Sequence, residues 1–312
     1  MGSYRDQVAA ALGAVTIRTP TRFVWLGHVS RALPVSLDAV LDDRTRRSYL
    51  VWTLREELYA SFFCQGGPVP ARGGRSEPDA DPWLTAAMSQ TNTGDGGWER
   101  GWTVERVEGP EAVVATTRLR MRVPVGDCRA RRGALRPGMA VSVRMPGELP
   151  AWSPGFLTVV SQAPADVAAE ESVVRVYWSV TRGGAAALVG ALTGRLNAAR
   201  APFRLKVADH PFRLNRCDAA VLYLPGPSFT PLRGALEDVA DALRAHLSPR
   251  VPAFTLELAS GVGLAEADGS GESFGVRRCA LLADAIVRAH EAGVTRTDER
   301  VDAVVARFAE EG

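Results

Sequence analysis

Lysine is almost absent from this sequence. Of its 37 lysine and arginine residues, only Lys206 is a lysine. Arginine stays protonated in proteins, whereas a lysine amine loses its proton when it is buried or crowded by other cations. A reaction that needs a neutral amine as its base therefore points to Lys206. The alternative interpretation is that Lys206 is a position where arginine has not yet replaced lysine, with no special role.

Cysteine and histidine are also scarce, with four of each in 312 residues. They are scattered and form no CxxC pair or HExxH motif, so the patterns of zinc sites are missing. We expect no metal ion and no organic cofactor. We expect the thiols to be small buried side chains, although the sequence leaves a catalytic thiol open. The cysteines are Cys64, Cys128, Cys217 and Cys279.

No apolar run reaches the roughly 18 residues that a transmembrane helix needs. The chain begins without the apolar core of a signal peptide, so we expect a cytoplasmic protein. Its formal net charge is +2, with arginine interspersed among Asp and Glu, which does not indicate a nucleic-acid or membrane partner.

Hydrophobic content of 46% and charged content of 23% are those of a globular protein. Periodic patterns predict an α+β fold, with a mixed helical and β N-terminal region in residues 1–165 and a second α+β domain in residues 166–312. The boundary is the Ala-, Glu- and Asp-rich stretch 163–172. We expect helices at 4–15, 37–42, 44–63, 82–90, 185–199, 232–247, 274–291 and 298–309. We expect strands within 102–160 and at 173–180, 203–207, 219–224 and 254–258, and a loop at 261–271.

Two of these strands carry polar side chains at alternating positions. Alternate residues of a strand share a face, so Arg175 and Tyr177 lie on one face of their strand. By the same rule, Arg204 and Lys206 share a face of theirs. If the two strands pair, one sheet face presents a base, a hydroxyl acid and a cation together.

A second candidate anion site is the start of the expected helix 274–291. The first turn of a helix has free N–H groups and the positive end of the dipole, which Arg277 and Arg278 oppose. An anion bound there would resolve the conflict. The alternative is a flexible loop followed by two solvated arginines.

A neutral amine, a phenol and arginines suit β-elimination of phosphate from phosphoserine or phosphothreonine. Lys206 would take the α-proton, and Tyr177 would protonate the leaving group. The arginines would hold the phosphate and stabilise its charge as it departs. This reaction requires no metal ion or organic cofactor.

Several blocks in the second half of the chain form a recognisable pattern. They are Arg175 to Trp178, Leu192 to Asn197, Pro202 to Val207, Arg216 to Tyr223, Gly261 to Glu266, and Gly271 to Gly275 with Arg278-Cys279. Together these blocks resemble the HopA-type effector family, and a weaker similarity covers Leu58 to Gly66 and Gly94 to Trp102. That family includes type III effectors of plant pathogens and stand-alone lyase components of class V lanthipeptide and thioamitide biosynthesis.

The resemblance implies a lyase domain with a central sheet flanked by helices. Its substrate would be a precursor peptide phosphorylated by a separate Ser/Thr kinase, and its product dehydroalanine or dehydrobutyrine, with a cyclase as a further partner. An extended leader peptide would add a strand to an exposed sheet edge, although no residue identifies that edge. The alternatives are a non-catalytic scaffold that binds the leader peptide or the kinase, and an effector-like interaction protein.

More distantly, the chain is similar to bacterial phosphothreonine lyases. That similarity implies Lys206 as the base, with Arg175 and Tyr177 in a basic-x-acid pattern. Tyr177 stands where those lyases have His, so the acid stays open and His210 is an alternative. The phosphate- and substrate-binding candidates are Arg175, Arg204, Arg213, Arg216, Arg277, Arg278, Tyr223 and Glu272.

Overall fold

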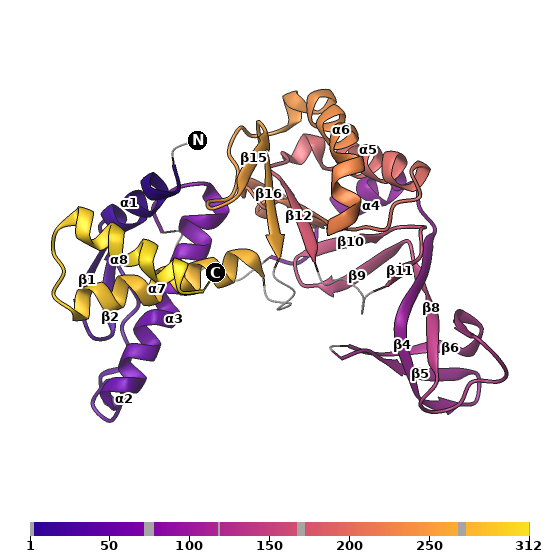
Figure 1. The fold of residues 1–312 in the computed structure, drawn as a ribbon, viewed down its shortest axis with the longest axis horizontal. Helices are drawn as coiled ribbons and strands as arrows, with labels where there is room; N and C mark the ends of the chain where they lie inside the picture. Colours follow the sequence, from indigo (N-terminus) through magenta and orange to yellow (C-terminus); the bar gives the residue numbers. More distant parts are fainter. Residues whose placement is uncertain (1–2, 72–77, 118, 167–171, 268–272, 312) are drawn as a thin grey trace.

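The computed structural model describes residues 3–71, 78–117, 119–166, 172–267 and 273–311. Within these ranges the fold is α+β, as predicted, and the strands form three sheets (Figure 1). The helices are α1 (Tyr4–Ala14), α2 (Val35–Asp38), α3 (Asp43–Ser61), α4 (Pro82–Thr91), α5 (Ala185–Ala198), α6 (Gly226–Ala242), α7 (Phe274–Glu291) and α8 (Thr297–Ala309).

The largest sheet has seven strands in the order β15-β16-β12-β14-β13-β10-β9, and every neighbouring pair is antiparallel. Alternation along its strands sends Val174, Val176 and Trp178 to one face, where α4, α5 and α6 cover them in a dry core. The strands are β9 (Glu148–Ser153), β10 (Phe156–Val160), β12 (Val173–Trp178), β13 (Arg204–Ala208), β14 (Ala220–Pro225), β15 (Leu256–Ala259) and β16 (Val262–Ala267).

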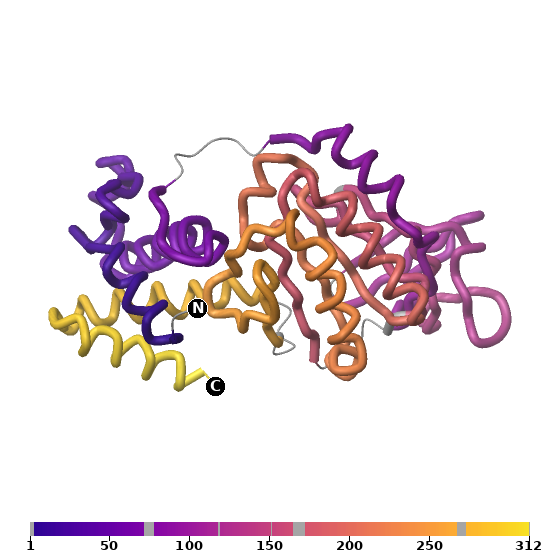
Figure 2. The backbone as a smooth tube through the Cα atoms, turned by 90° about the horizontal axis from the view of Figure 1, so that it is seen from above, coloured from indigo at the N-terminus to yellow at the C-terminus, as the bar shows by residue number. Residues whose placement is uncertain are grey.

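A layer of helices from both ends of the chain packs at one end of the other face. Helix α3 packs along α7, α7 contacts α8, and α8 contacts α1, so the N- and C-terminal segments lie together (Figure 2). Their core reaches the sheet, because Tyr177 and Val221 belong to the same buried cluster as Phe63 and Cys279. The sheet β1 (Val15–Thr19), β2 (Arg22–Trp25) and β3 (His28–Val29) joins this layer.

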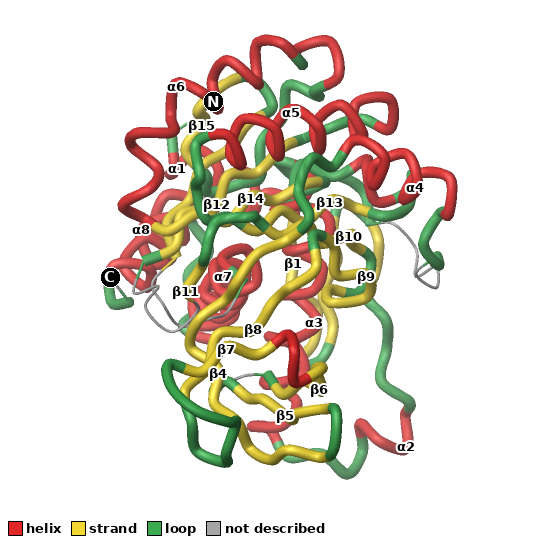
Figure 3. Tube along the Cα trace, turned by 90° about the vertical axis from the view of Figure 1, so that its right-hand side faces the viewer, coloured by secondary structure: helices red, strands yellow, loops and turns green. Residues whose placement is uncertain are grey.

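The remaining sheet forms an arm with its own small core around Trp102 and Val143. Figure 3 shows this arm on the side of the large sheet opposite α5 and α6. Its main path is β6-β5-β4-β8-β7, and β11 (Ala165–Asp166) pairs in parallel with β4. The strands are β4 (Gly96–Glu108), β5 (Glu111–Ala115), β6 (Arg120–Pro124), β7 (Cys128–Ala130) and β8 (Ala140–Pro146).

Three local predictions need correction. The expected loop 261–271 contains strand β16, which pairs with β12 along six residues. Helix α2 covers Val35–Asp38, so it begins before the predicted 37 and ends before the predicted 42. Helix α6 begins at Gly226, before the predicted 232, and accommodates Pro231 in its interior.

The seven-stranded sheet takes strands from both sides of residue 165, since β9 and β10 precede it. The division of the chain at that residue stays a prediction. In the part of the chain that the structure describes, we find no helix both long enough and apolar enough to cross a membrane.

Candidate active site on the polar face of the sheet

The face of the large sheet opposite α5 and α6 carries two rows of polar side chains. Backbone pairing aligns Arg204, Tyr223 and Arg175 across β13, β14 and β12. Two residues farther along, it aligns Lys206, Val221 and Tyr177. Directly opposite residues have Cβ atoms about 5 Å apart, so each row places its side chains side by side. The predicted sharing of one face by Arg175, Tyr177 and Lys206 is therefore present, although β12 and β13 are not paired directly. Strand β14 lies between them.

Lys206 lies at the centre of this face and is half-buried. It forms no hydrogen bond or ion pair with any residue that the structure describes, and its Nζ lies 5.4 Å from the centre of the Tyr223 ring. Burial lowers the pKa of the Lys206 amine, and the charges of Arg175 and Arg204 lower it further. Both effects disfavour the ammonium form, which makes the neutral amine more accessible than it is in water.

Arg175 and two phenols surround the amine. Arg175 is 8% exposed, and its guanidinium carbon lies 5.9 Å from the centre of the Tyr223 ring. Tyr177 is 4% exposed and packs edge-on against Phe63. Burial raises the pKa of both Tyr177 and Tyr223, and the nearby Arg175 offsets part of that rise. Both phenols are therefore protonated at neutral pH, and each keeps an O–H group that can donate a hydrogen bond.

Three of the predicted phosphate-binding arginines already have carboxylate partners. Arg204 pairs with the buried Glu99 of β4 and lies 5.6 Å from the Trp152 ring centre. Buried Arg213 pairs with Asp209 at 2.6 Å and donates to the carbonyl of Pro78 at 2.8 Å. Arg213 therefore fastens the β13–β14 loop to the segment before α4.

Arg216 is the third of these arginines. It forms a bidentate salt bridge with Asp218, in which both hydrogen bonds are 2.7 Å long. The Tyr59 hydroxyl donates to the same carboxylate at 3.3 Å, and the Cys64 thiol lies 3.6 Å from it. Burial and the Asp218 charge raise the pKa of Tyr59 and of Cys64. This cluster joins α3 to the segment just before β14, beside the polar face. It leaves the Cys64 thiol protonated, which argues against a nucleophilic role for it.

The other predicted site residues do not gather at Lys206. Arg277 lies 3.8 Å from Glu311, and Arg278 packs against the rings of Phe274 and Phe308 on α7 and α8. His210 lies in the loop after β13, where its Nδ1 accepts a hydrogen bond from the Phe212 N–H at 3.1 Å. Glu272 lies outside the described residues.

Two residues of the polar face were missing from the sequence prediction. Thr158 of β10 lies directly opposite Lys206, is 1% exposed, and its hydroxyl has no hydrogen-bond partner among the described residues. Glu99 neutralises Arg204 from a strand 105 residues earlier. Alternation within 156–160 would have placed Thr158 opposite Leu157 and Val159, but only the strand order brings it beside Lys206.

This face offers no ready metal site. Within the described ranges, no three His, Cys, Asp or Glu side chains gather closely enough to hold a metal ion. The arrangement instead combines a lysine amine of lowered pKa, two protonated phenols and the Arg175 cation. Such a set suits removal of a proton from carbon beside a departing anion.

Comparisons with known proteins place these observations in a family. A search of the curated proteins found no match. Two solved structures are similar, those of the effector proteins from Pseudomonas syringae pv. tomato strain DC3000 and pv. syringae strain 61. They are 18% and 19% identical to this chain, with TM-scores of 0.38 and 0.37. Each match covers 50% of this chain and 61% of the effector.

The match to a family model is more extensive. It covers residues 148–312, which is more than half of the sequence. It begins where β9 begins and so includes every strand of the seven-stranded sheet. The chain therefore belongs to the HopA1 effector protein family.

Proposed function

We propose that this protein is a phosphoserine/phosphothreonine lyase that removes phosphate from a peptide by β-elimination. One observation carries the proposal. The single lysine of the chain is half-buried between Arg175 and Arg204, its pKa is lowered, and no described carboxylate pairs with it. A lysine placed only for structure would be expected to gain an ion pair or to reach solvent.

In the proposed step, the neutral Lys206 amine takes the proton from the α-carbon of the phosphorylated residue. The electrons of that C–H bond form the double bond between the α- and β-carbons. The bond between the β-carbon and the phosphate oxygen breaks, and its electron pair leaves with the phosphate. The products are a dehydroalanine or dehydrobutyrine residue, inorganic phosphate that has taken a proton from an acid, the deprotonated acid and a lysine ammonium group. The ammonium proton then returns to the acid through water, which restores both groups.

Arg175 is the main phosphate ligand in this proposal. It lies on the same face as Lys206, and the Tyr223 ring contacts both cations. Arg204 adds positive charge, but Glu99 already occupies its guanidinium. Arg216 is likewise engaged by both oxygens of Asp218. Neither guanidinium can donate two hydrogen bonds to a phosphate unless its pairing with the carboxylate is broken.

We assign the proton donor for the leaving phosphate to Tyr223 in preference to Tyr177. Tyr223 is partly exposed and contacts both Lys206 and Arg175. Tyr177 is almost fully buried against Phe63, so a substrate reaches it less easily. In this assignment Tyr177 positions Arg175, which lies on the same face of β12 and to which it is hydrogen-bonded.

The proposed substrate is a ribosomally made precursor peptide, phosphorylated by a separate Ser/Thr kinase of a lanthipeptide-type pathway. A cyclase would consume the dehydrated product. Family membership supports this proposal only in general terms, because the family description names effector proteins. The β-elimination chemistry is supported by the polar face alone.

The direct test is incubation of the purified protein with synthetic phosphoserine and phosphothreonine peptides at up to millimolar concentration. Loss of phosphoric acid is followed by mass spectrometry. Wild type is compared with Lys206→Arg, which keeps the charge, and Lys206→Met, which keeps the stem. We expect both variants to lose elimination by about 10²–10⁴-fold.

Elimination by wild type that both variants lose, with their fold intact by circular dichroism, supports the lyase. Variants that keep the wild-type rate overturn the role of Lys206. A wild type that is inert on these peptides and on a kinase-treated precursor overturns the lyase and leaves the scaffold alternative.

A further inference from the structure

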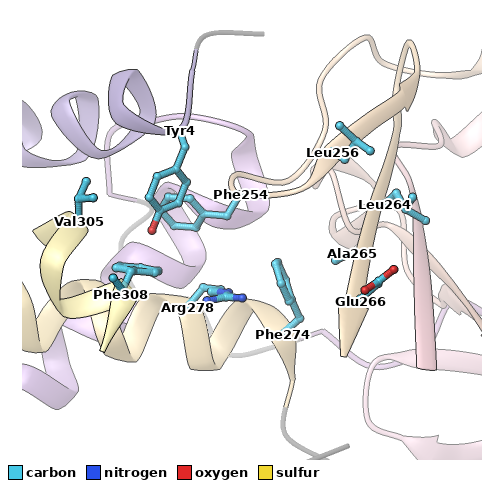
Figure 4. Close-up of a pocket in the computed structure, with 11 residues that line it drawn as sticks. Tyr4, Phe254, Leu256, Leu264, Ala265, Glu266, Phe274, Arg278, Val305 and Phe308 are labelled. Carbon is cyan, nitrogen blue, oxygen red and sulfur yellow. The ribbon is translucent and has the colours of Figure 1, made fainter. Parts of the chain in front are cut away.

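A groove of about 580 Å³ lies where the edge of the seven-stranded sheet meets the layer of α1, α7 and α8. The sheet side of the groove comes from the start of β15 and the end of β16. The other walls are mainly aromatic side chains from α1, α7, α8 and the turn before β15 (Figure 4). Arg278 of α7 also lines the groove.

The sheet wall of this groove includes an unpaired strand edge. Strand β15 pairs with β16 only as far as the Leu256–Leu264 pair. Beyond that point, Ala265 to Ala267 pair with β12 on one side. No described strand covers their other side. A sheet edge with free N–H and C=O groups is a template for an added strand. Three residues of strand span about 10 Å, so the edge has room for a short extended peptide.

The walls of the groove are largely apolar, and their aromatic side chains already pack against one another. Leu256 is 67% exposed on the groove side of β15. Phe254 has a φ of 65°, which is uncommon for a bulky residue, and its ring contacts those of Tyr4 and Phe308. The turn at Phe254 precedes β15, which begins only at Leu256, so β15 does not lie beside Ala265 to Ala267 of β16. Apolar side chains of an added strand would be buried against these rings.

Arg278 gives the groove its charge. Its guanidinium carbon lies 5.2 Å from the Phe274 ring centre and 5.9 Å from that of Phe308. It has no ion pair with a carboxylate among the described residues, and the groove's own Glu266 does not pair with it. In the view of Figure 4, Phe274 stands between Arg278 and Glu266. Near the N-terminus of α7 a cation also opposes the helix dipole. A carboxylate from outside would pair with the guanidinium.

The groove adjoins the polar face. Ala265, in the groove wall, pairs across the backbone with Arg175 of β12. Ring contacts also run from Tyr177 through Phe63 and Phe274 to Arg278. A strand added to the edge of β16 would lie two strands from Arg175 on β12 and four from Lys206 on β13. A residue beyond that strand in the same peptide would have to cross the sheet face to reach them.

We infer that this groove docks an extended segment of the substrate peptide as an added strand on β16, with apolar side chains against the aromatic walls and a carboxylate on Arg278. The inference rests on the proposed function for the identity of the peptide. It assigns Arg278 to recognition of a distant part of the substrate, whereas the sequence suggested a role at the phosphate.

The test uses a fluorescein-labelled, unphosphorylated synthetic peptide in which Val-Glu-Val-Leu is flanked by Gly-Ser spacers, with binding measured by fluorescence anisotropy. Three matched peptides carry Gln in place of Glu, Gly in place of the apolar residues, or N-methylated backbone amides. The proteins are wild type, Arg278→Gln, Arg278→Lys and the control Arg288→Gln. Arg288 lies on the same helix but pairs with Asp284 outside the groove.

We expect Arg278→Gln to weaken binding at least about tenfold, since a hydrogen bond to a charged group contributes about 1.5–3 kcal/mol. Arg278→Lys should lose less, and Arg288→Gln should bind as wild type does. The Gln, Gly and N-methylated peptides should each bind more weakly to wild type. Thermal melts check that Arg278→Gln is folded.

Undetectable binding by wild type, or equal binding by wild type and a folded Arg278→Gln, overturns the groove assignment. Full binding of the N-methylated peptide overturns the added strand. Because the probe has no phosphate, the result is independent of catalysis. Elimination from a short phosphopeptide without probe binding refutes the groove alone, and probe binding without elimination refutes the lyase alone.

Discussion

The two faces of the seven-stranded sheet differ in what they bury, although they share every strand. On β12, Val174, Val176 and Trp178 enter the core beneath α5 and α6. The residues between them, Arg175 and Tyr177, point to the opposite face. The first face shows what a sheet needs for stability, which is apolar area removed from water. The second face holds groups that this requirement does not explain.

The polar face brings like charges together. Arg175 and Arg204 both lower the pKa of Lys206, which means that all three charges oppose one another. Farther from Lys206, Arg213 pairs with Asp209 and Arg216 pairs with Asp218. The contrast shows that the fold can neutralise arginines beside this face, whereas no described carboxylate neutralises the lysine. Unneutralised positive charge is what binding of an anion such as phosphate requires.

The largest effect should come from removing the main cation of the polar face. Arg175→Gln is expected to lower kcat/KM for a phosphopeptide by about 10²–10³-fold, as for loss of one donor that stabilises developing charge. Steady-state kinetics by phosphate release measures it. The control is Arg233→Gln, whose arginine forms an exposed pair with Glu237 on α6. Equal losses in both variants would show that positive charge in general, and not this face, supports the reaction.

A substitution on the apolar face should act on stability instead. Leu222→Ala removes a fully buried side chain of β14 and should lower the free energy of unfolding by about 3 kcal/mol. Leu256→Ala, at an exposed position, should change it by less than about 0.5 kcal/mol. Urea unfolding followed by circular dichroism measures both. If Leu222→Ala is as mild as Leu256→Ala, the two faces are not as distinct as described.

The paired arginine beside the polar face provides an intermediate case. Asp218→Asn leaves Arg216 without its charge partner, and breaking a buried pair costs about 3–5 kcal/mol. Because the Arg216 side chain is 24% exposed, we expect a smaller loss of about 2 kcal/mol in the same unfolding experiment. Asp241→Asn, which breaks an exposed pair with Arg244, should cost less than about 1 kcal/mol. Equal costs would mean that burial does not matter here.

The smallest effect is a shift in pH dependence. The base must be neutral, so kcat/KM should rise with pH through the lowered pKa of Lys206 and level off below 10.5, its ordinary value. Arg204→Gln removes a cation and should move the inflection to higher pH. The unfolded chain binds more protons between the two pKa values, so this lysine makes stability rise with pH across that window. A pH–rate profile that stays in place in Arg204→Gln would contradict the electrostatic account.

The spacing of apolar residues predicted much of the secondary structure, because helix bounds and strand faces depend mainly on neighbouring residues. The apolar period of α7 gave its bounds, 274–291, and alternation gave the shared face of Arg175 and Tyr177. The order of the strands was out of reach, since nothing in 203–207 records that β14 intervenes before β12. Strand β16 was missed because Gly263 and its alanines are typical of a loop, while its pairing with β12 holds it extended.

The site was predicted less completely for the same reason. Lys206 was found by its rarity and Arg175 by strand alternation, which are both properties of the sequence itself. The Glu99 partner of Arg204 and the buried hydroxyl of Thr158 come from strands that are distant in sequence. Arg278 was expected at the phosphate because its position opposes the helix dipole, but that conflict does not indicate which anion resolves it.

The central claim is that the Lys206 amine has a lowered pKa, and the scarcity of lysine makes it directly measurable. Protein grown with lysine labelled at its ζ-nitrogen carries one labelled side chain, so an NMR titration follows Lys206 alone. We predict an inflection clearly below 10.5 that moves upward in Arg204→Gln and when inorganic phosphate is added. An inflection at or above 10.5 would contradict the account, because the amine would then be an ordinary cation and not a base.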